Sequence, residues 1–208
     1  MAITAKLVSE LRAKTGAGIM DCKKALVESD GDMTKAVEYL QKKSLAAVAK
    51  RAGKIAAEGA VYSYIHDGRV GAMVEVNSET DFVARGDDFQ AMIKNIAMHI
   101  AASNPIYLDS SEIPAEVTDK QKEIYAAQLL AEGKPEAMIE RIMVGKLKKW
   151  HRDVCLLNQD YVKDDKLSVQ EYVTEVASTI KENIKVRRFV RFELGEGIEK
   201  KEEDFAAE

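Results

Sequence analysis

The sequence predicts an α+β fold: a three-helix N-terminal module, then an antiparallel three-stranded sheet covered by helices, with an inserted helical hairpin. Three observations predict it. Through roughly the first forty residues, apolar side chains recur every three or four positions, which is typical of amphipathic helices. Two alternating runs then flank Asp67-Gly68, a pair typical of a tight β-hairpin. A third alternating run lies much later, at residues 184–194.

Each helix of the N-terminal module has its own apolar stripe. Thr4 is placed to cap the first helix, and Asp30-Gly31-Asp32 interrupts the chain and caps the third. The stripe positions are Ile3, Leu7 and Leu11 in the first helix, Ile19, Cys22 and Leu26 in the second, and Met33, Ala36, Val37 and Leu40 in the third. Residues 1–43 are therefore predicted to form one domain. Residues 44–59, rich in Ala and Lys, form a helical connector that leads out of it.

Residues 60–197 are predicted to form the α+β core. Its first two strands are expected at residues 60–66 and 69–77, and the third strand joins them across a long sequence separation. Two helices should cover one face of the sheet. One spans residues 89–102, and the other starts at Ser168, where a glutamate three residues later completes a capping box.

Two further helical patterns, at residues 115–132 and 136–157, predict a helical hairpin inserted into the core at about residues 115–157. Trp150 falls on the apolar stripe of the second pattern, which favours a place in a core or an interface over a ligand site. After the core, only a short charged tail is expected, at residues 198–208.

The segment Thr80-Asp81-Phe82-Val83 is the strongest candidate for a functional site. Strand alternation ends at Asn77, and Gly86-Asp87-Asp88 opens a helical pattern with carboxylates at its positive end. A carboxylate and an aromatic ring therefore stand side by side in a short connection between a strand and a helix. Two interpretations are open from the residues alone. Either Phe82 packs beneath the helix while Asp81 caps a turn, or the pair contacts a partner.

Composition narrows the class of function. A net charge of -4 disfavours non-specific binding of nucleic acid. The basic clusters within the helical patterns are interpreted as solvated helix faces, because acidic residues lie beside them. Cys22 and Cys155 fit no metal or redox spacing, and the sequence has no signal-peptide core or membrane-length apolar run. We therefore expect a cytoplasmic protein with no membrane role.

Signals for catalysis are missing as well. His66, His99 and His151 share no ligand spacing with the cysteines, and we expect them to lie at the surface or to be partly buried. No phosphate-binding glycine loop occurs in the sequence. No set of nucleophile, base and metal ligand has a diagnostic spacing either. We expect no enzymatic activity, no metal and no cofactor.

Residues 11–26, 80–83 and 188–200 carry a resemblance to a known family. They are similar to segments of bacterial elongation factor Ts, the guanine-nucleotide exchange factor for elongation factor Tu, and residues 80–83 match its Thr-Asp-Phe-Val signature. With residues 162–166 between them, the resemblance runs from end to end. It implies a protein that promotes GDP release from elongation factor Tu so that GTP can rebind. It also implies an N-terminal module of the ubiquitin-associated type.

The resemblance assigns a first contact site to the connection after the second strand. In the family, the Asp-Phe pair inserts into the G domain of elongation factor Tu near the magnesium site. This role falls to Asp81 and Phe82, with Thr80 and Val83 shaping the loop. The implied partner is elongation factor Tu in its GDP-bound and nucleotide-free forms.

A second contact site is implied in the N-terminal module, which in the family also grips the G domain. The matching positions are Arg12, Ile19 and Met20. The spacing of Ile19 with Cys22 and Leu26 equally fits a core residue of the three-helix module, so both interpretations of Ile19 stay open.

The chain differs from longer members of the family, which carry two related subdomains in the core. Only one strand-hairpin-helix unit with one such loop is found here. We therefore predict a homodimer, which gives a two-to-two complex with elongation factor Tu. Two alternatives remain. The first is a ubiquitin-associated-type adaptor without exchange activity, and the second is a catalyst built from scattered acids and histidines, which no spacing favours.

Overall fold

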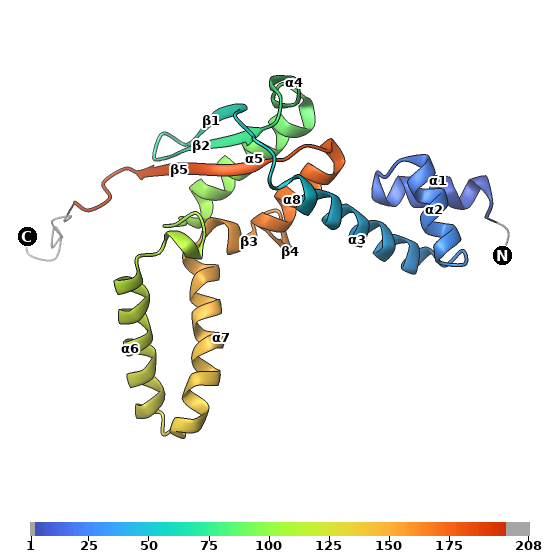
Figure 1. Cartoon of the computed structure of the whole chain (residues 1–208). Coiled ribbons are helices and arrows are strands. Elements are labelled where there is room, and N and C mark those ends of the chain that lie inside the picture. Colours follow the sequence, from blue (N-terminus) through green and yellow to red (C-terminus); the bar gives the residue numbers. More distant parts are fainter. Residues whose placement is uncertain (1–2, 199–208) are drawn as a thin grey trace, which may run out of the picture.

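The computed structural model describes residues 3–198 and has the predicted α+β architecture. A helical module at the N-terminus is joined by one long helix to a sheet that helices cover, and a helical hairpin projects away from both (Figure 1). The charged tail expected at residues 198–208 lies, apart from its first residue, outside the described residues.

The N-terminal module has three helices: α1 (Ala5–Thr15), α2 (Ile19–Glu28) and α3 (Met33–Arg51). The hydroxyl of Thr4 accepts a hydrogen bond from the Leu7 amide, and Asp32 caps α3 in the same way. The small core of the module is formed by Val8, Leu11, Cys22, Ala25, Leu26, Ala36 and Leu40. Helix α3 continues without a break past residue 43 through the first part of the predicted connector.

The α+β core contains a three-stranded antiparallel sheet with the order β1-β2-β5. Its strands are β1 (Glu58–His66), β2 (Val70–Ser78) and β5 (Lys185–Glu193). The hairpin turn lies at Asp67-Gly68, as predicted, with φ angles of 48° and 67°. Both angles are in the left-handed region that this tight turn requires.

Strand β5 does not keep a single alternation from residue 184 to residue 194. Its register against β2 shifts between Glu75 and Val76, which leaves Arg187 as an extra residue. The bulge reverses the two faces of the strand. As a result Phe189 packs against the core, whereas Phe192 is exposed.

An ion-pair cluster of one glutamate and two arginines lies at this bulge. The carboxylate of Glu75 accepts hydrogen bonds from Arg187 at 2.7 Å and from Arg188 at 2.6 Å. The two guanidinium groups hold the pKa of Glu75 at about 2. Consecutive arginines can both reach one carboxylate here because the bulge takes them out of the regular alternation.

Three helices pack on the sheet or beside it: α4 (Asp81–Ala84), α5 (Asp87–Ser103) and α8 (Val169–Ile180). Helix α5 contacts β1 and β2, and α8 packs against α5 (Figure 1). The capping box predicted at Ser168 is present. Fully buried side chains between the sheet and these helices include Val74, Val76, Phe89, Met92, Ile93, Ile96, Ile100 and Val169.

The predicted helical hairpin is formed by α6 (Ala115–Ala131) and α7 (Glu136–Val154). Trp150 is half-buried on α7. Short 3-10 turns, η1 (Ser110–Glu112) and η2 (Leu156–Asn158), lie at the base of the hairpin. A second small sheet follows, β3 (Asp160–Tyr161) with β4 (Asp164–Ser168), which the sequence analysis did not predict.

Candidate functional site

The segment Thr80-Asp81-Phe82-Val83 forms one helical turn between β2 and α5, at an outer end of the sheet (Figure 1). Thr80 caps this turn, because its hydroxyl accepts a hydrogen bond from the Val83 amide at 3.4 Å. The Asp81 carboxylate pairs with Arg85, one turn further on, at 2.9 Å. The interpretation in which Asp81 is the cap is therefore wrong.

The Phe82 ring is 84% exposed, so the interpretation in which it packs beneath α5 is also wrong. Ala84 turns inward instead and joins the main core. Burying such a ring is worth about 1.5–3 kcal/mol, and the isolated chain forgoes that gain. The turn thus exposes an apolar ring and a carboxylate at the surface.

Two carboxylates outside the turn support it, and the sequence analysis named neither. Glu182, in the connection between α8 and β5, accepts hydrogen bonds from the amides of Glu79 and Thr80. Glu79 in turn accepts from the Asn183 amide, and the basic side chains of Arg51 and Lys54 pair with it. These groups, first the Asn183 amide and then Lys54 and Arg51, lower the pKa of Glu79.

The three residues of the N-terminal module that the family resemblance assigns to a contact, Arg12, Ile19 and Met20, lie at the surface around the connection between α1 and α2. Ile19 and Met20 are 55% and 76% exposed in the first turn of α2, and Arg12 is exposed near the end of α1. The interpretation of Ile19 as a core residue is wrong. Cys22 and Leu26, on the same stripe, fill the module's core instead.

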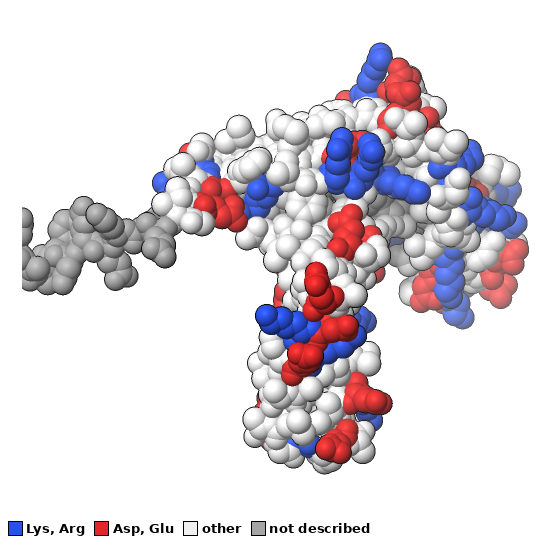
Figure 2. All heavy atoms as spheres, turned by 60° about the vertical axis from the view of Figure 1, so that its left-hand side comes forward, with Lys and Arg blue, Asp and Glu red and all other residues white. Residues whose placement is uncertain are grey.

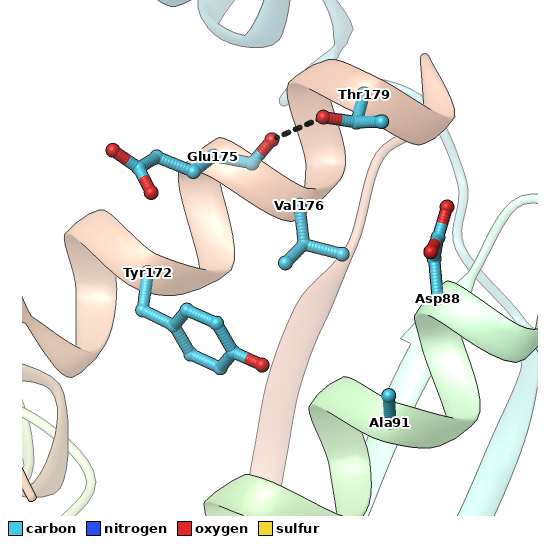
Figure 3. A pocket seen from close by; sticks show the side chains of 6 residues that line it. All are labelled: Asp88, Ala91, Tyr172, Glu175, Val176 and Thr179. Atoms are coloured by element: carbon cyan, nitrogen blue, oxygen red, sulfur yellow. Dashed lines mark hydrogen bonds between the residues drawn. The ribbon is translucent and has the colours of Figure 1, made fainter. Parts of the chain in front are cut away.

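Two hollows lie on either side of α8. The larger, of about 630 Å³, separates the N-terminal module from α8 and is partly lined by Arg12 and Lys181. The smaller, of about 280 Å³, lies between α8 and α5 (Figure 3). Asp88 and Glu175 line it, and burial raises the pKa of Glu175. The two carboxylates do not point toward one another. They do not form the paired acid and base that hydrolysis would use.

Charged side chains of both signs are interspersed over the helical hairpin, as Figure 2 shows. For the basic cluster at residues 146–149 of α7, this arrangement agrees with the interpretation as a solvated helix face. Within residues 3–198, no group of histidine, cysteine and acidic side chains could hold a metal ion. No helix in that described part is long and apolar enough to cross a membrane.

His99 is fully buried, so the expectation of surface or partly buried histidines is wrong for this residue. Its Nδ1 accepts a hydrogen bond from the Val162 amide at 3.2 Å, and its Nε2 lies 2.9 Å from Oε1 of Gln159. Burial lowers the pKa of His99 and favours the neutral ring. The side chain thus ties α5 to the segment that contains β3, which is a structural role.

Comparisons with known proteins agree on one family. A family model described as Elongation factor TS matches residues 3–196. The chain is 57% identical to elongation factor Ts of Geobacter sulfurreducens over 100% of its length and 97% of the relative. It is 56% identical to elongation factor Ts of Acetivibrio thermocellus, with 99% and 96% of the two chains covered. The chain therefore belongs to the elongation factor Ts family of translation elongation factors.

Proposed function

We propose that this protein is a guanine-nucleotide exchange factor for elongation factor Tu. It binds the GDP-bound form, promotes GDP release by inserting Asp81 and Phe82 near the magnesium site of the G domain, and leaves the nucleotide-free form ready for GTP. The observation that carries the proposal is the 84% exposed ring of Phe82 on a capped turn, in a chain of this family. The protein needs no catalytic site of its own for this role.

Thermodynamic linkage sets what such a factor must do. A protein that weakens the partner's hold on GDP must itself bind the nucleotide-free partner more tightly, by the same factor. Each tenfold change corresponds to about 1.4 kcal/mol. Burial of the Phe82 ring in the partner gives about 1.5–3 kcal/mol, which is enough for a tenfold to hundredfold effect from one side chain.

The magnesium ion of the partner is the vulnerable point. Mg²⁺ requires nearly ideal octahedral geometry, so a small displacement of its surroundings weakens its hold on the phosphates. Asp81 lies next to Phe82 and is exposed, so insertion of the ring brings a carboxylate into the same region. That negative charge also opposes the phosphates of the departing nucleotide.

The N-terminal module supplies a second contact in this proposal. Arg12, Ile19 and Met20 offer one cation and two apolar side chains on neighbouring ends of α1 and α2. Helix α3 runs from this module to the core and contacts α8, and the hydroxyls of Ser44 and Ser178 are hydrogen-bonded between them. Grip by the module and insertion of the turn can therefore act on one G domain together.

We also propose that the protein is a homodimer and forms a two-to-two complex with elongation factor Tu. The sheet face opposite α5 supports this proposal, because it exposes apolar side chains from all three strands. They are Val61, Ile65, Met73, Val190 and Phe192, with Leu194 just beyond β5. A contiguous apolar patch of this kind is typical of an interface.

The release rate of a fluorescent GDP from elongation factor Tu tests the exchange proposal. We expect the wild-type protein to accelerate release, and Asp81→Ala and Phe82→Ala to lose most of that acceleration. Val144→Ala, which removes a 68% exposed apolar side chain from α7, is the control and should behave as wild type. Binding to elongation factor Tu without any acceleration would favour the adaptor alternative instead.

A further inference from the structure

The turn that carries Phe82 rests on two carboxylates that cross between neighbouring connections. Glu182 reaches from the end of α8 and accepts hydrogen bonds through Oε2 from the amides of Glu79 and Thr80, both at 3.1 Å. Glu79 reaches in the opposite direction and accepts from the Asn183 amide at 2.8 Å. We call Glu79 and Glu182 the crossed clamp.

The hydroxyl of Thr80 connects this clamp to the turn itself. It donates its single proton to Oε1 of Glu182 at 2.7 Å. Its oxygen is then left to accept the hydrogen bond from the Val83 amide. One atom thus joins the Glu182 carboxylate to the first turn of α4 and fixes the direction in which that turn starts.

The inner side of the turn is anchored by Ala84, which is buried in the main core, and by Val83, which packs against it. The outer side, which carries Asp81 and Phe82, has fewer contacts. Helix α4 spans only Asp81–Ala84, which is far too short to be stable by itself. The Phe82 ring points outward and the Asp81–Arg85 pair is exposed, so neither adds much stability. Charged acceptors form the strongest hydrogen bonds, and Glu182 supplies three of them at the base of the turn.

The clamp also fixes the turn relative to the N-terminal helices. Glu79 accepts hydrogen bonds from Arg51 at 3.2 Å and from Lys54 at 3.0 Å, and these residues lie at and just beyond the end of α3. The side chain of Asn183 donates to the Lys54 carbonyl at 2.7 Å. The crossed clamp is therefore bonded to the C-terminal end of α3, the helix whose first part belongs to the N-terminal module.

We propose that Glu182 is a positioning residue for nucleotide exchange: it holds the Asp81-Phe82 turn in the orientation that inserts into the G domain. This inference rests on the proposed exchange function. It predicts that loss of Glu182 slows GDP release more than it weakens binding to elongation factor Tu, because the N-terminal module supplies a separate contact.

The test compares Glu182→Ala with Glu182→Gln in the fluorescent-GDP release assay over a range of factor concentrations. We expect Glu182→Ala to lower the maximal release rate about tenfold and to change the half-saturating concentration less. Glu182→Gln should restore most of the rate, because its amide oxygen can accept from both backbone amides and its nitrogen can donate to Thr80. Glu175→Ala, which replaces a glutamate inside α8 and away from the turn, is the control.

A double variant distinguishes an effect of Glu182 that acts through Phe82 from a general loss of folded structure. If Glu182 acts through the Phe82 ring, adding Glu182→Ala to Phe82→Ala should cause no further loss of exchange rate. A further tenfold loss in the double variant would overturn the proposal. An unchanged maximal rate for Glu182→Ala, beside an active wild type, would overturn it while the exchange function stands.

Amide hydrogen exchange of the protein alone gives a readout that does not depend on elongation factor Tu. In Glu182→Ala, the amides of Glu79, Thr80 and Val83 should exchange faster, whereas those of α5 should be unchanged. Unchanged protection at these three amides would overturn the inference that Glu182 holds the turn. A wild-type protein that fails to accelerate GDP release would overturn the exchange function instead, and with it the role of Glu182 in exchange.

Discussion

Two phenylalanines, seven positions apart, have opposite surroundings. Phe89, near the start of α5, is 0% exposed and packs between that helix and the sheet. Phe82, on the turn before α5, is 84% exposed. Phe89 belongs to an apolar stripe that continues along its helix, and Phe82 belongs to none. The comparison separates a ring that the fold needs from a ring that is free to meet a partner.

The largest effect on stability is expected for the buried ring. Phe89→Ala should lower the free energy of unfolding by about 3–5 kcal/mol, because it removes a fully buried ring and leaves a cavity. Urea denaturation followed by circular dichroism measures this change. A loss below about 1 kcal/mol would show that the core collapses easily around the site, and the contrast with Phe82 would weaken.

A third phenylalanine, Phe192, is 70% exposed on the open face of the sheet. If this face forms the homodimer, Phe192→Ala removes burial worth about 1.5–3 kcal/mol per ring and raises the dimer dissociation constant at least tenfold. Sedimentation equilibrium measures the constant, with Val144→Ala as the control. A wild type that is monomeric at micromolar concentration would contradict the dimer.

Periodicity explains why most of the fold could be predicted from the sequence. Phe89 lies in a regular stripe, Ser168 begins a capping box, and Asp67-Gly68 requires a tight turn, so each local signal agrees with the final structure. The small β3–β4 hairpin was missed because its strands are short and mostly polar. The bulge at Arg187 was missed because the exposed apolar residues Val190 and Phe192 continue the apolar alternation of Ile184 and Val186, which conceals the reversal of the two faces.

The candidate site was predictable only in part. Residues 80–83 were found because a strand pattern ends there and a family signature coincides with it. Whether Phe82 would be buried could not follow from periodicity, because a ring outside any stripe has no assigned face. Glu79 and Glu182 were not found, since they are about a hundred positions apart and only the folded chain brings them together.

The pH dependence of the turn offers a further test of the comparison. The Asn183 amide, with Lys54 and Arg51, holds the pKa of Glu79 below its ordinary value of 4.5. The support from Glu79 is therefore complete above about pH 4.5 and is lost as the pH falls through the lowered pKa. We expect amide protection of the turn, corrected for intrinsic exchange, to fall in this range while that near Phe89 persists.

The variant Glu79→Gln provides the control for this pH step, because it carries no titrating group at the same place. Its turn should be less protected at neutral pH and should show little additional loss on acidification. If wild type and Glu79→Gln lose protection in parallel, another carboxylate controls the turn.

The smallest effect on stability is expected for the exposed ring, and it decides whether Phe82 and Phe89 have different roles. Phe82→Ala should change the free energy of unfolding by less than about 0.5 kcal/mol, because the exposed ring has almost no contacts to lose. Urea denaturation beside Phe89→Ala measures the difference between the two sites. A neutral effect on stability would mean that any loss of nucleotide exchange in Phe82→Ala reflects a contact with the partner. A loss of more than about 1 kcal/mol would instead mean that the ring packs against its own chain in solution, and insertion into the G domain would then require that packing to be broken first.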